Sequence, residues 1–485
     1  MEKMTKTVFC VGLALLAWCG EAKVEFATPF GDGMVLQRER PVPVWGTADA
    51  GATVEVRFAG QAKTAVAGSN GCWQVTLDPM PASKDGRVLE AGAVLNGRDA
   101  RSPVNSGLNG RDARFPVKSE AKVADVLVGE VWLVSGQSNC ELPLVGETPH
   151  FSDRQGLLVA NMTRQPNIRF AYASTYRWSR EERKELRERA VWKPFLPQHL
   201  KTGKNFSAMG VYFALDLYAA LDVPVGLVGN YMNGSPIRRW TPTGAFYRTY
   251  VTRWMPYAIR GLLWNQGDAD SENPDYCRLL HELYDGWSRG FENAEMSLYL
   301  QEQSHGTDDC FHLTLAQERF VREEPHAAMA VINDLGNEFN EIHPNEKEIV
   351  AKRLAVHALK RDYGFDIAED DSPGFRAAAF RDGKAIVEFD HATGLYVYSR
   401  DRSHDTAFEL AGADGVWKPA KILNFGPAKD KFGKPIVGDY IAGPVLELRS
   451  EAVPQPVKVR YLGEPRTMGT VYNQASLPLG AFEMK

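Results

Sequence analysis

The stretch VGEVWLVSGQSNCELPL, residues 128–144, decides the fold of this chain. Its first half is a continuous apolar run, which is typical of a strand buried on both faces of a parallel sheet. The run ends at Gly136, and Ser138 follows where a helix would begin. Free N–H groups at such a place favour the negative charge that a serine generates when it attacks an ester. Ser138 is therefore predicted to be either a nucleophile or a simple helix cap, and Ser135 to secure the strand end.

Apolar runs alternate with amphipathic segments after residue 122. Strands are predicted at residues 126–134, 225–229, 261–264, 297–300 and 328–332. Helices are predicted at residues 207–220, 275–291, 312–323 and about 345–361. Buried strands that alternate with helices indicate a mostly parallel α/β sheet, and ligands of such sheets bind at the carboxyl ends of the strands.

Short strands separated by turn residues flank this region on both sides. They read GMVLQ, PVPVWGT, ATVEVRFAG, KTAVAG and WQVTL before it, and KAIVEFD, GLYVYS, VLELRS and VKVRYLG after it. The pattern of the first set is typical of an antiparallel β-sandwich. LNGRDARSPV from Leu95 recurs as LNGRDARFPV from Leu108, which we interpret as a duplicated surface loop. We predict a β-sandwich segment with this loop insertion at 23–122, an α/β domain at 123–365 and a β-rich segment at 366–485.

The first 22 residues have the layout of a secretory signal peptide. Lys3 and Lys6 precede an apolar stretch from Val8 to Trp18, which is too short to span a bilayer. Cys19 could carry a lipid anchor, but Trp18 disfavours that alternative. Four scattered cysteines remain after cleavage, too few for a disulfide framework in a chain of 485 residues. We expect a protein that is secreted or periplasmic.

The composition of the chain limits which kinds of partner and cofactor we expect. The formal charge of −5 is spread along the chain, with no basic stripe that would indicate nucleic-acid binding. None of the ten histidines has the spacing of a metal-ligand motif, so we expect neither a metal nor another cofactor. A nucleophilic serine still needs a base. His343 is the candidate, because it lies in the loop before the last predicted helix and Pro344 fixes the chain after it.

Several blocks together resemble the sialate O-acetylesterase family, a branch of the SGNH (GDSL-like) hydrolases. The matching blocks are FGDGMVLQRERPVPVWGTADAGATVEV, GEVWLVSGQSN, NFSAMGVYFALDL, MPYAIRGLLWNQGD, DLGNEFNEIHPNEK, VPQPVKVRYLG and NQASLP. Their shared order along nearly the whole chain is far more specific than GQSN alone. The resemblance implies a three-layer SGNH-hydrolase domain with a mostly parallel sheet, between amino-terminal and carboxy-terminal β segments.

The resemblance also implies site residues. Ser138 would be the nucleophile and His343 the general base. The oxyanion hole would consist of the backbone N–H groups of Ser138 and Gly234 and the side-chain amide of Gln266, and one such donor is typically worth ~10²- to 10³-fold in rate. Asn139 and Gly267 would support the loops. Without the resemblance, Gly234 reads as a turn residue and Gln266 as the polar end of a strand.

Two departures from the family pattern concern the carboxylates. The block that usually runs WYQGESN is WNQGDAD here, so that Asp268 replaces a glutamate. Asn340 stands three residues before His343, where many SGNH enzymes have an aspartate, and an asparagine cannot stabilise an imidazolium in the same way. Glu341, Asp334 or Asp268 could supply the charge instead, or Ser138 and His343 could work as a dyad.

The sequence thus predicts a secreted, cofactor-free carbohydrate esterase. Its partner would be an acetylated sugar or glycan, either sialic acid or an acetylated plant polysaccharide, and its reaction would pass through an acyl-enzyme. The alternative is a glycan-binding protein of the same fold with little or no catalysis. Labelling of Ser138 by an organophosphonate distinguishes the two.

Overall fold

The computed structural model describes residues 23–94, 117–146, 148, 151–172, 190–201, 206–303, 310–336, 342–398, 406–424, 426–429, 435–440, 443–465 and 467–484. The signal-like residues 1–22 and the repeat at 95–116 lie outside these ranges. The described residues divide into two compact units, one of residues 23–26, 45–75, 90–94 and 117–122, the other of the described parts of 27–44, 76–89 and 123–485. The second unit thus includes two stretches of the predicted β-sandwich segment.

The first unit consists of short antiparallel strands. They are β1 (Glu25–Phe26), the end of β3 (Val42–Thr47), β4 (Thr53–Phe58), β5 (Gln61–Val66), most of β6 (Cys72–Leu77), the end of β7 (Ser83–Val94) and the start of β8 (Val117–Gly136). β4 pairs with both β5 and β7. Its side chains alternate, with Val54, Val56 and Phe58 buried, as expected for a strand with one face in a core. The predicted antiparallel β region is confirmed.

The sheet that carries the candidate site belongs to the second unit. Its strand order is β10-β9-β11-β8-β12-β13-β14. The remaining bounds are β9 (Gln165–Tyr172), β10 (Lys193–Phe195), β11 (Val225–Tyr231), β12 (Gly261–Asn265), β13 (Ser297–Gln301) and β14 (Ala327–Ala330). All neighbours pair in parallel except β10 with β9. Every residue of β11, β12, β13 and β14 is buried, which explains their continuous apolar sequences.

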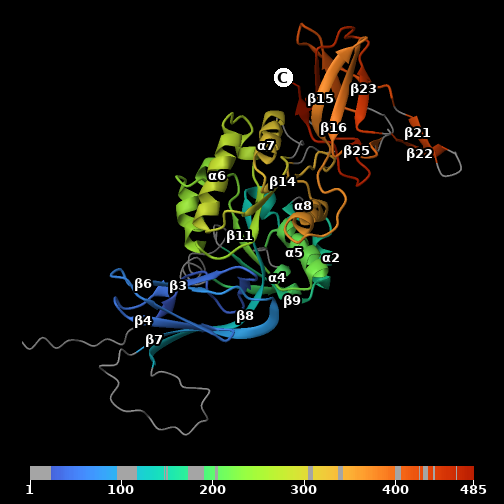
Figure 1. Cartoon of the computed structure of the whole chain (residues 1–485). Helices are drawn as coiled ribbons and strands as arrows, with labels where there is room; N and C mark the ends of the chain where they lie inside the picture. The colour runs from blue at the N-terminus through green and yellow to red at the C-terminus, as the bar shows by residue number, and fades with distance from the viewer. Residues whose placement is uncertain are drawn as a thin grey trace, which may run out of the picture. The chain divides into compact units, whose positions relative to one another are not determined.

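Helices cover both faces of this sheet (Figure 1). α5 (Ala208–Leu221) packs against α8 (Lys347–Arg361), and α6 (Tyr276–Gly290) packs against α7 (Phe311–Glu323). Ser207 caps α5, since its hydroxyl accepts a hydrogen bond from the backbone N–H of Gly210. Shorter helices are α1 (Ser138–Glu141), α2 (Gly156–Met162), α4 (Pro197–Leu200), η2 (Ile237–Arg239), η3 (Tyr247–Val251), η4 (Thr252–Trp254) and η5 (Asp268–Asp270).

The last part of the second unit consists of antiparallel strands, drawn in orange and red in Figure 1. The first sheet has the strand order β15 (Gly374–Arg381), β16 (Lys384–Asp390), β23 (Val445–Arg449), β20 (Lys421–Ile422). The second has the order β21 (Gly426–Lys429), β22 (Pro435–Tyr440), β17 (Tyr396–Val397), β25 (Val471–Tyr472). The third has the order β19 (Trp417–Pro419), β18 (Phe408–Ala411), β24 (Lys458–Tyr461), β26 (Phe482–Glu483). Their apolar core also contains Phe311 of α7. β2 (Val35–Gln37) pairs in parallel with β8.

The predicted α/β class, with a parallel sheet and added β regions, is confirmed. The long helices begin and end within about two residues of their predicted bounds. β9, β10 and α2 have no counterpart in the prediction, and the predicted strand at 328–332 is shorter and one residue earlier. Within the described ranges, no helix has both the length and the apolar character needed to span a membrane.

Candidate active site

The carboxyl end of β8 meets the carboxyl ends of two neighbouring strands at Gly136. Tyr231 of β11 and Asn265 of β12 are both in register with this residue. The backbone of Gln137 donates to Asn265 O at 2.9 Å, and Met232 N donates to Gly136 O at 3.0 Å. The loops after β8, β11 and β12 therefore begin at one point on the sheet edge, where ligands of α/β sheets bind.

Gly136 is required at this junction. Its φ of 141° lies in a region that other residues rarely adopt. A Cβ at this position would lie 1.9 Å from the carbonyl oxygen of Asn265, far inside contact distance. The absence of a side chain is what lets β8 and β12 remain paired up to Gly136, two residues before the candidate nucleophile.

Ser138 begins the one-turn helix α1 directly after this junction. Its exposed fraction is 4%. Cys140 in the same turn is fully buried, and burial strongly raises the pKa of its thiol, so it is an inert apolar filler. Ser135 Oγ donates to Asn230 O of β11 at 2.5 Å. The prediction that Ser135 secures the strand end is therefore confirmed.

The segment that carries His343 lies against α1. Asn139, next to Ser138, donates through Nδ2 to the carbonyl oxygen of Ile342 at 2.7 Å, and Ile342 precedes His343. The ring of Phe151 packs edge-on against the imidazole, with 5.4 Å between ring centroids. Two sequence blocks that lie 200 residues apart are thus brought to adjacent positions, with Asn139 as the direct link.

Gly234 lies in an open turn after β11. It has a φ of 63°, and a Cβ there would meet no atom within 4 Å. Hydrogen bonds fix the turn on its far side: Ser235 Oγ donates to Met232 O at 2.7 Å, and Trp240 Nε1 donates to Ser235 Oγ at 2.9 Å. A left-handed glycine on a braced turn can present its backbone N–H to a substrate without a side chain in the way.

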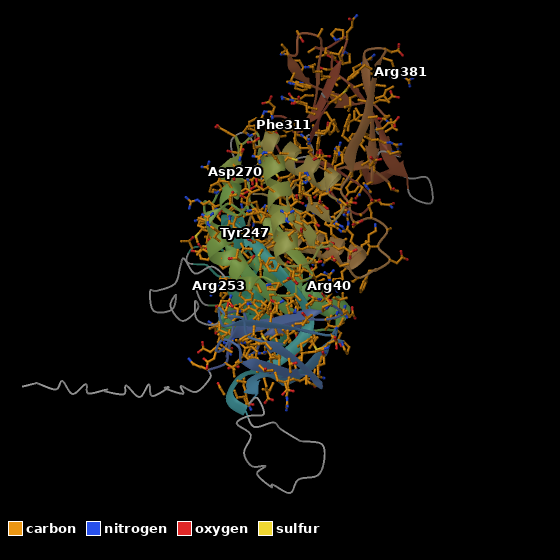
Figure 2. All side chains as sticks on the ribbon, turned by 60° about the vertical axis from the view of Figure 1, so that its left-hand side comes forward. Arg40, Tyr247, Arg253, Asp270, Phe311 and Arg381 are labelled. Carbon is orange, nitrogen blue, oxygen red and sulfur yellow. The ribbon has the colours of Figure 1, made fainter. Side chains whose placement is uncertain are left out.

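The amide of Gln266 is held by acceptors inside the protein. Its Nε2 lies 2.7 Å from Asp270 Oδ2, 3.1 Å from Ser235 O and 3.2 Å from Gln137 Oε1. Asp270, labelled in Figure 2, also accepts from the backbone N–H of Ile237 at 2.6 Å. The carboxylate of Asp270 therefore fixes which way the Gln266 amide faces, and it ties the loop after β12 to the loop after β11.

A network of polar side chains connects Gln137, the residue before Ser138, with the predicted candidate Asp268 and with Gln303, which sequence reasoning missed. Gln137 donates through Nε2 to Asp268 Oδ2 at 2.7 Å, and Gln303 donates to the other oxygen of Asp268. Burial raises the pKa of the Asp268 carboxyl, while the bond from Gln303 opposes that shift. Gly267 leaves room for this contact, since a Cβ there would lie 2.3 Å from Gln303 Oε1. Gln137 was visible in the GQSN motif, whereas nothing in the sequence singled out Gln303.

The candidates for a third catalytic member have different positions. Asp334 forms two hydrogen bonds with Arg353, at 2.7 Å each, so its carboxylate is engaged by a guanidinium. Asp268 is engaged by the two glutamines. Asn340 and Glu341 lie outside the described residues.

Some side chains of the kinds that bind metals lie close together elsewhere in the chain. Within the described residues, two groups have donor atoms close enough to share an ion: Cys277, His281 and Glu323 in one, and His357, Asp370 and Asp371 in the other. Arg319 already pairs with Glu323 at 2.7 Å, and Arg361 with Asp370 at 2.8 Å. Because these carboxylates have cationic partners, we assign no metal to either group.

Comparisons with known proteins point to one kind of enzyme. Residues 128–359 match the family model of carbohydrate esterases described as sialic acid-specific acetylesterase. The chain is 27% identical to human sialate O-acetylesterase over 422 residues, which is 73% of this chain and 74% of the relative. It is 25% identical to the mouse sialate O-acetylesterase over 494 residues, 82% of this chain and 85% of the relative. A crystal structure of a carbohydrate acetylesterase from Xanthomonas citri superposes with a TM-score of 0.77 at 25% identity, covering 95% of this chain and 99% of the other.

Proposed function

We propose that this chain, whose residues 128–359 match the model of the sialic acid-specific acetylesterase family of carbohydrate esterases, removes O-acetyl groups from sugars with Ser138 as its nucleophile. The observation that carries the proposal is the hydrogen bond from Asn139 to Ile342 O, because it joins the residue after Ser138 to the residue before His343. Proton transfer requires the nucleophile and its base to lie within hydrogen-bond reach, and this bond holds their neighbouring residues together.

In the first half of the reaction, Ser138 Oγ attacks the carbonyl carbon of the acetyl ester while His343 takes the hydroxyl proton. The carbonyl oxygen becomes an oxyanion. When the tetrahedral intermediate collapses, the bond from carbon to the sugar oxygen breaks, and His343 returns its proton to that oxygen. The sugar leaves as an alcohol, and Ser138 remains acetylated.

In the second half, water attacks the acetyl group and His343 takes its proton. The bond between carbon and Ser138 Oγ then breaks, and the proton on His343 returns to the serine. Acetic acid leaves and releases its remaining proton to water as acetate. The oxyanion of both steps would accept hydrogen bonds from the backbone N–H groups of Ser138 and Gly234. Gln266 would contribute a third donor by sharing its amide with the oxyanion in place of Ser235 O or Gln137, while Asp270 keeps it oriented.

Asn139 and Gly267 act in this proposal as loop supports. Asn139 holds the loop of Ser138 and the loop of His343 together, and Gly267 allows Gln303 to reach Asp268. Of the acidic candidates, Asp334 and Asp268 have the partners described above. Arg353 already pairs with Asp334, whereas the two glutamines on Asp268 are neutral. The imidazolium that forms on His343 would therefore be stabilised by Asp268 or by a group in residues 340–341, or Ser138 and His343 would act as a dyad.

The proposal is tested by comparing the wild type with Ser138→Ala on p-nitrophenyl acetate and on acetylated sugars. Loss of the nucleophile should lower kcat by about 10³-fold or more, with unchanged folding by circular dichroism. Ser135→Ala is the matched control, because it removes a neighbouring hydroxyl that holds the strand end. An organophosphonate should label Ser138 in the wild type. Equal activity of wild type and Ser138→Ala would contradict the role of Ser138 as nucleophile. Absence of labelling in the wild type, with sugar binding retained, would favour a glycan-binding protein instead.

The substrate class and the location of the protein are part of the same proposal. The relatives are named for sialate esters, and the Xanthomonas citri protein more broadly for carbohydrate acetyl esters. We propose an acetylated sugar or glycan as substrate, and acetate release from acetylated sialic acid, xylan and pectin would rank the candidates. The signal-like residues 1–22 support export, which amino-terminal sequencing of the mature protein would test.

A further inference from the structure

Lys347 is a buried lysine that contacts Asn139, the residue after the candidate nucleophile. It is the first residue of α8, four residues after His343, and its exposed fraction is 0%. Lysines are almost never fully buried unless their charge has a partner. Here the Nζ atom donates to Asn139 Oδ1 at 2.8 Å. The ammonium group of Lys347 is therefore held by the side chain that links the nucleophile and base segments.

A second set of contacts fixes the direction of Lys347. Its backbone N–H donates to Asp153 Oδ2 at 3.1 Å. Asp153 is itself buried, and its other oxygen accepts from the Tyr212 hydroxyl at 2.6 Å and from the backbone of Gln155 at 2.9 Å. Because the main chain at Lys347 is anchored in this way, the side chain has a fixed starting point from which to reach Asn139.

The bond from Lys347, together with the Asp268 carboxylate that Asn139 also meets, sets which way the Asn139 carboxamide faces. An ammonium group can only donate, so Asn139 must present Oδ1 to it. Nδ2 is then left pointing to Ile342 O, where it makes the bond of 2.7 Å. A hydrogen bond with a charged donor is about twice as strong as a neutral one, so the wrong orientation of the amide is strongly disfavoured.

We propose that Lys347 is a positioning residue of this hydrolase. It acts through Asn139 to hold the His343 segment in its place next to the Ser138 segment. The inference rests on the proposed function of Ser138 and His343. An apolar side chain of similar length would fill the same space without the cost of burying a charge. What it would lack is the donor that orients Asn139, and a displacement of about 1 Å between reacting groups can cost about 10²-fold in rate.

The test uses the full-length chain and the variant Lys347→Met, which keeps the volume and removes the donor. We expect kcat on p-nitrophenyl acetate to fall by about 10- to 100-fold while KM changes less than about twofold, because the lysine orients the reacting groups and does not bind substrate. Lys352→Met is the matched control, since Lys352 is an exposed lysine on the same helix and should keep wild-type kcat.

A double-mutant cycle shows whether Lys347 works through Asn139. If it does, adding Lys347→Met to Asn139→Ala should lower kcat little further, because the orienting contact is already lost. Losses that multiply, or a wild-type kcat in Lys347→Met, would overturn the inference. Should Lys347→Met fail to fold, Asn139→Asp keeps a partner for the ammonium but cannot donate to Ile342 O, and a wild-type kcat in that variant would also overturn it.

The failure of this inference is distinct from the failure of the proposed function. Full activity in Ser138→Ala would remove the catalytic premise itself. An inactive Ser138→Ala together with a fully active Lys347→Met would leave the esterase proposal intact and assign Lys347 to structure alone.

Discussion

Burial lowers the pKa of Lys347 from 10.5 to about 8, and this shift links a single residue to the stability of the whole chain. Between pH 8 and 10.5 the unfolded lysine still holds a proton that the folded one has released. The unfolded state then binds more protons, so this residue makes the free energy of unfolding rise with pH across that window. The full effect is on the order of 3 kcal/mol.

This pH dependence is measured as a difference between two proteins. Urea unfolding of the wild type and of Lys347→Met from pH 7.5 to 10.5 should give curves whose separation changes in favour of the wild type as the pH rises. Buried tyrosines such as Tyr257 and Tyr276, whose pKa values are raised, act in the opposite sense in both proteins and cancel. A constant separation would contradict a depressed pKa for Lys347.

Some residue roles could be read from the sequence and others could not. Ser135 was predicted correctly, because a strand end has a recognisable pattern. Lys347 and Gln303 were missed because lysine and glutamine usually lie on surfaces, and only the fold shows that these two are buried. The roles of Ser138, His343, Gly234 and Gln266 stay predictions that the described variants test.

β8 can pair with β12 up to its last residue, Gly136, only because this residue has no side chain. Gly136→Ala would place a methyl group 1.9 Å from Asn265 O and would also strain a φ of 141°. We expect the free energy of unfolding to fall by about 3 kcal/mol or more. Chemical denaturation followed by tryptophan fluorescence measures this change.

Gly234→Ala provides the comparison for that experiment. It shares the positive φ, but the added methyl group meets nothing within 4 Å. Only the conformational cost remains, about 1 kcal/mol. Similar losses in the two variants would show that backbone strain, and not the approach of β12, sets the requirement for glycine at position 136.

Long helices and strands were easier to predict from the sequence than short ones. α6 and α8 have enough turns for an apolar face to show in the sequence, and β11, β12 and β13 are continuous apolar runs. β9 begins with Gln165, Pro166 and Asn167, so its apolar half is only a few residues long. β10 has three residues, and its existence depends on pairing with β9, which no local pattern reveals.

Across the second unit, Phe311 joins α7 to the core of the carboxy-terminal strands. This side chain, labelled in Figure 2, is 6% exposed and packs in the same cluster as Phe389, Leu410 and Phe482. Phe311→Ala should lower the free energy of unfolding by about 3–5 kcal/mol because it leaves a cavity in that cluster. Thermal and urea unfolding of the purified variant measure the loss.

Phe365→Ala is the matched control, since Phe365 is 39% exposed and its loss leaves no cavity. A Phe311→Ala protein as stable as this control would mean that the carboxy-terminal strands contribute little to holding α7. The boundary at residue 366 was predicted from the return of strands. A helix side chain that belongs to the core of those strands could not be foreseen, because strand and helix patterns do not show which elements share a core.

The meeting of three strands at Gly136 also bears on how the protein folds. β8 pairs with β11 and β12, which follow it by roughly a hundred residues, so the loops of the site come together only after two long chain closures. Contacts between such distant residues form slowly, since the entropy of closing the chain opposes them. During refolding, esterase activity should therefore return after most of the helical signal, and its reappearance would report that the central sheet is complete.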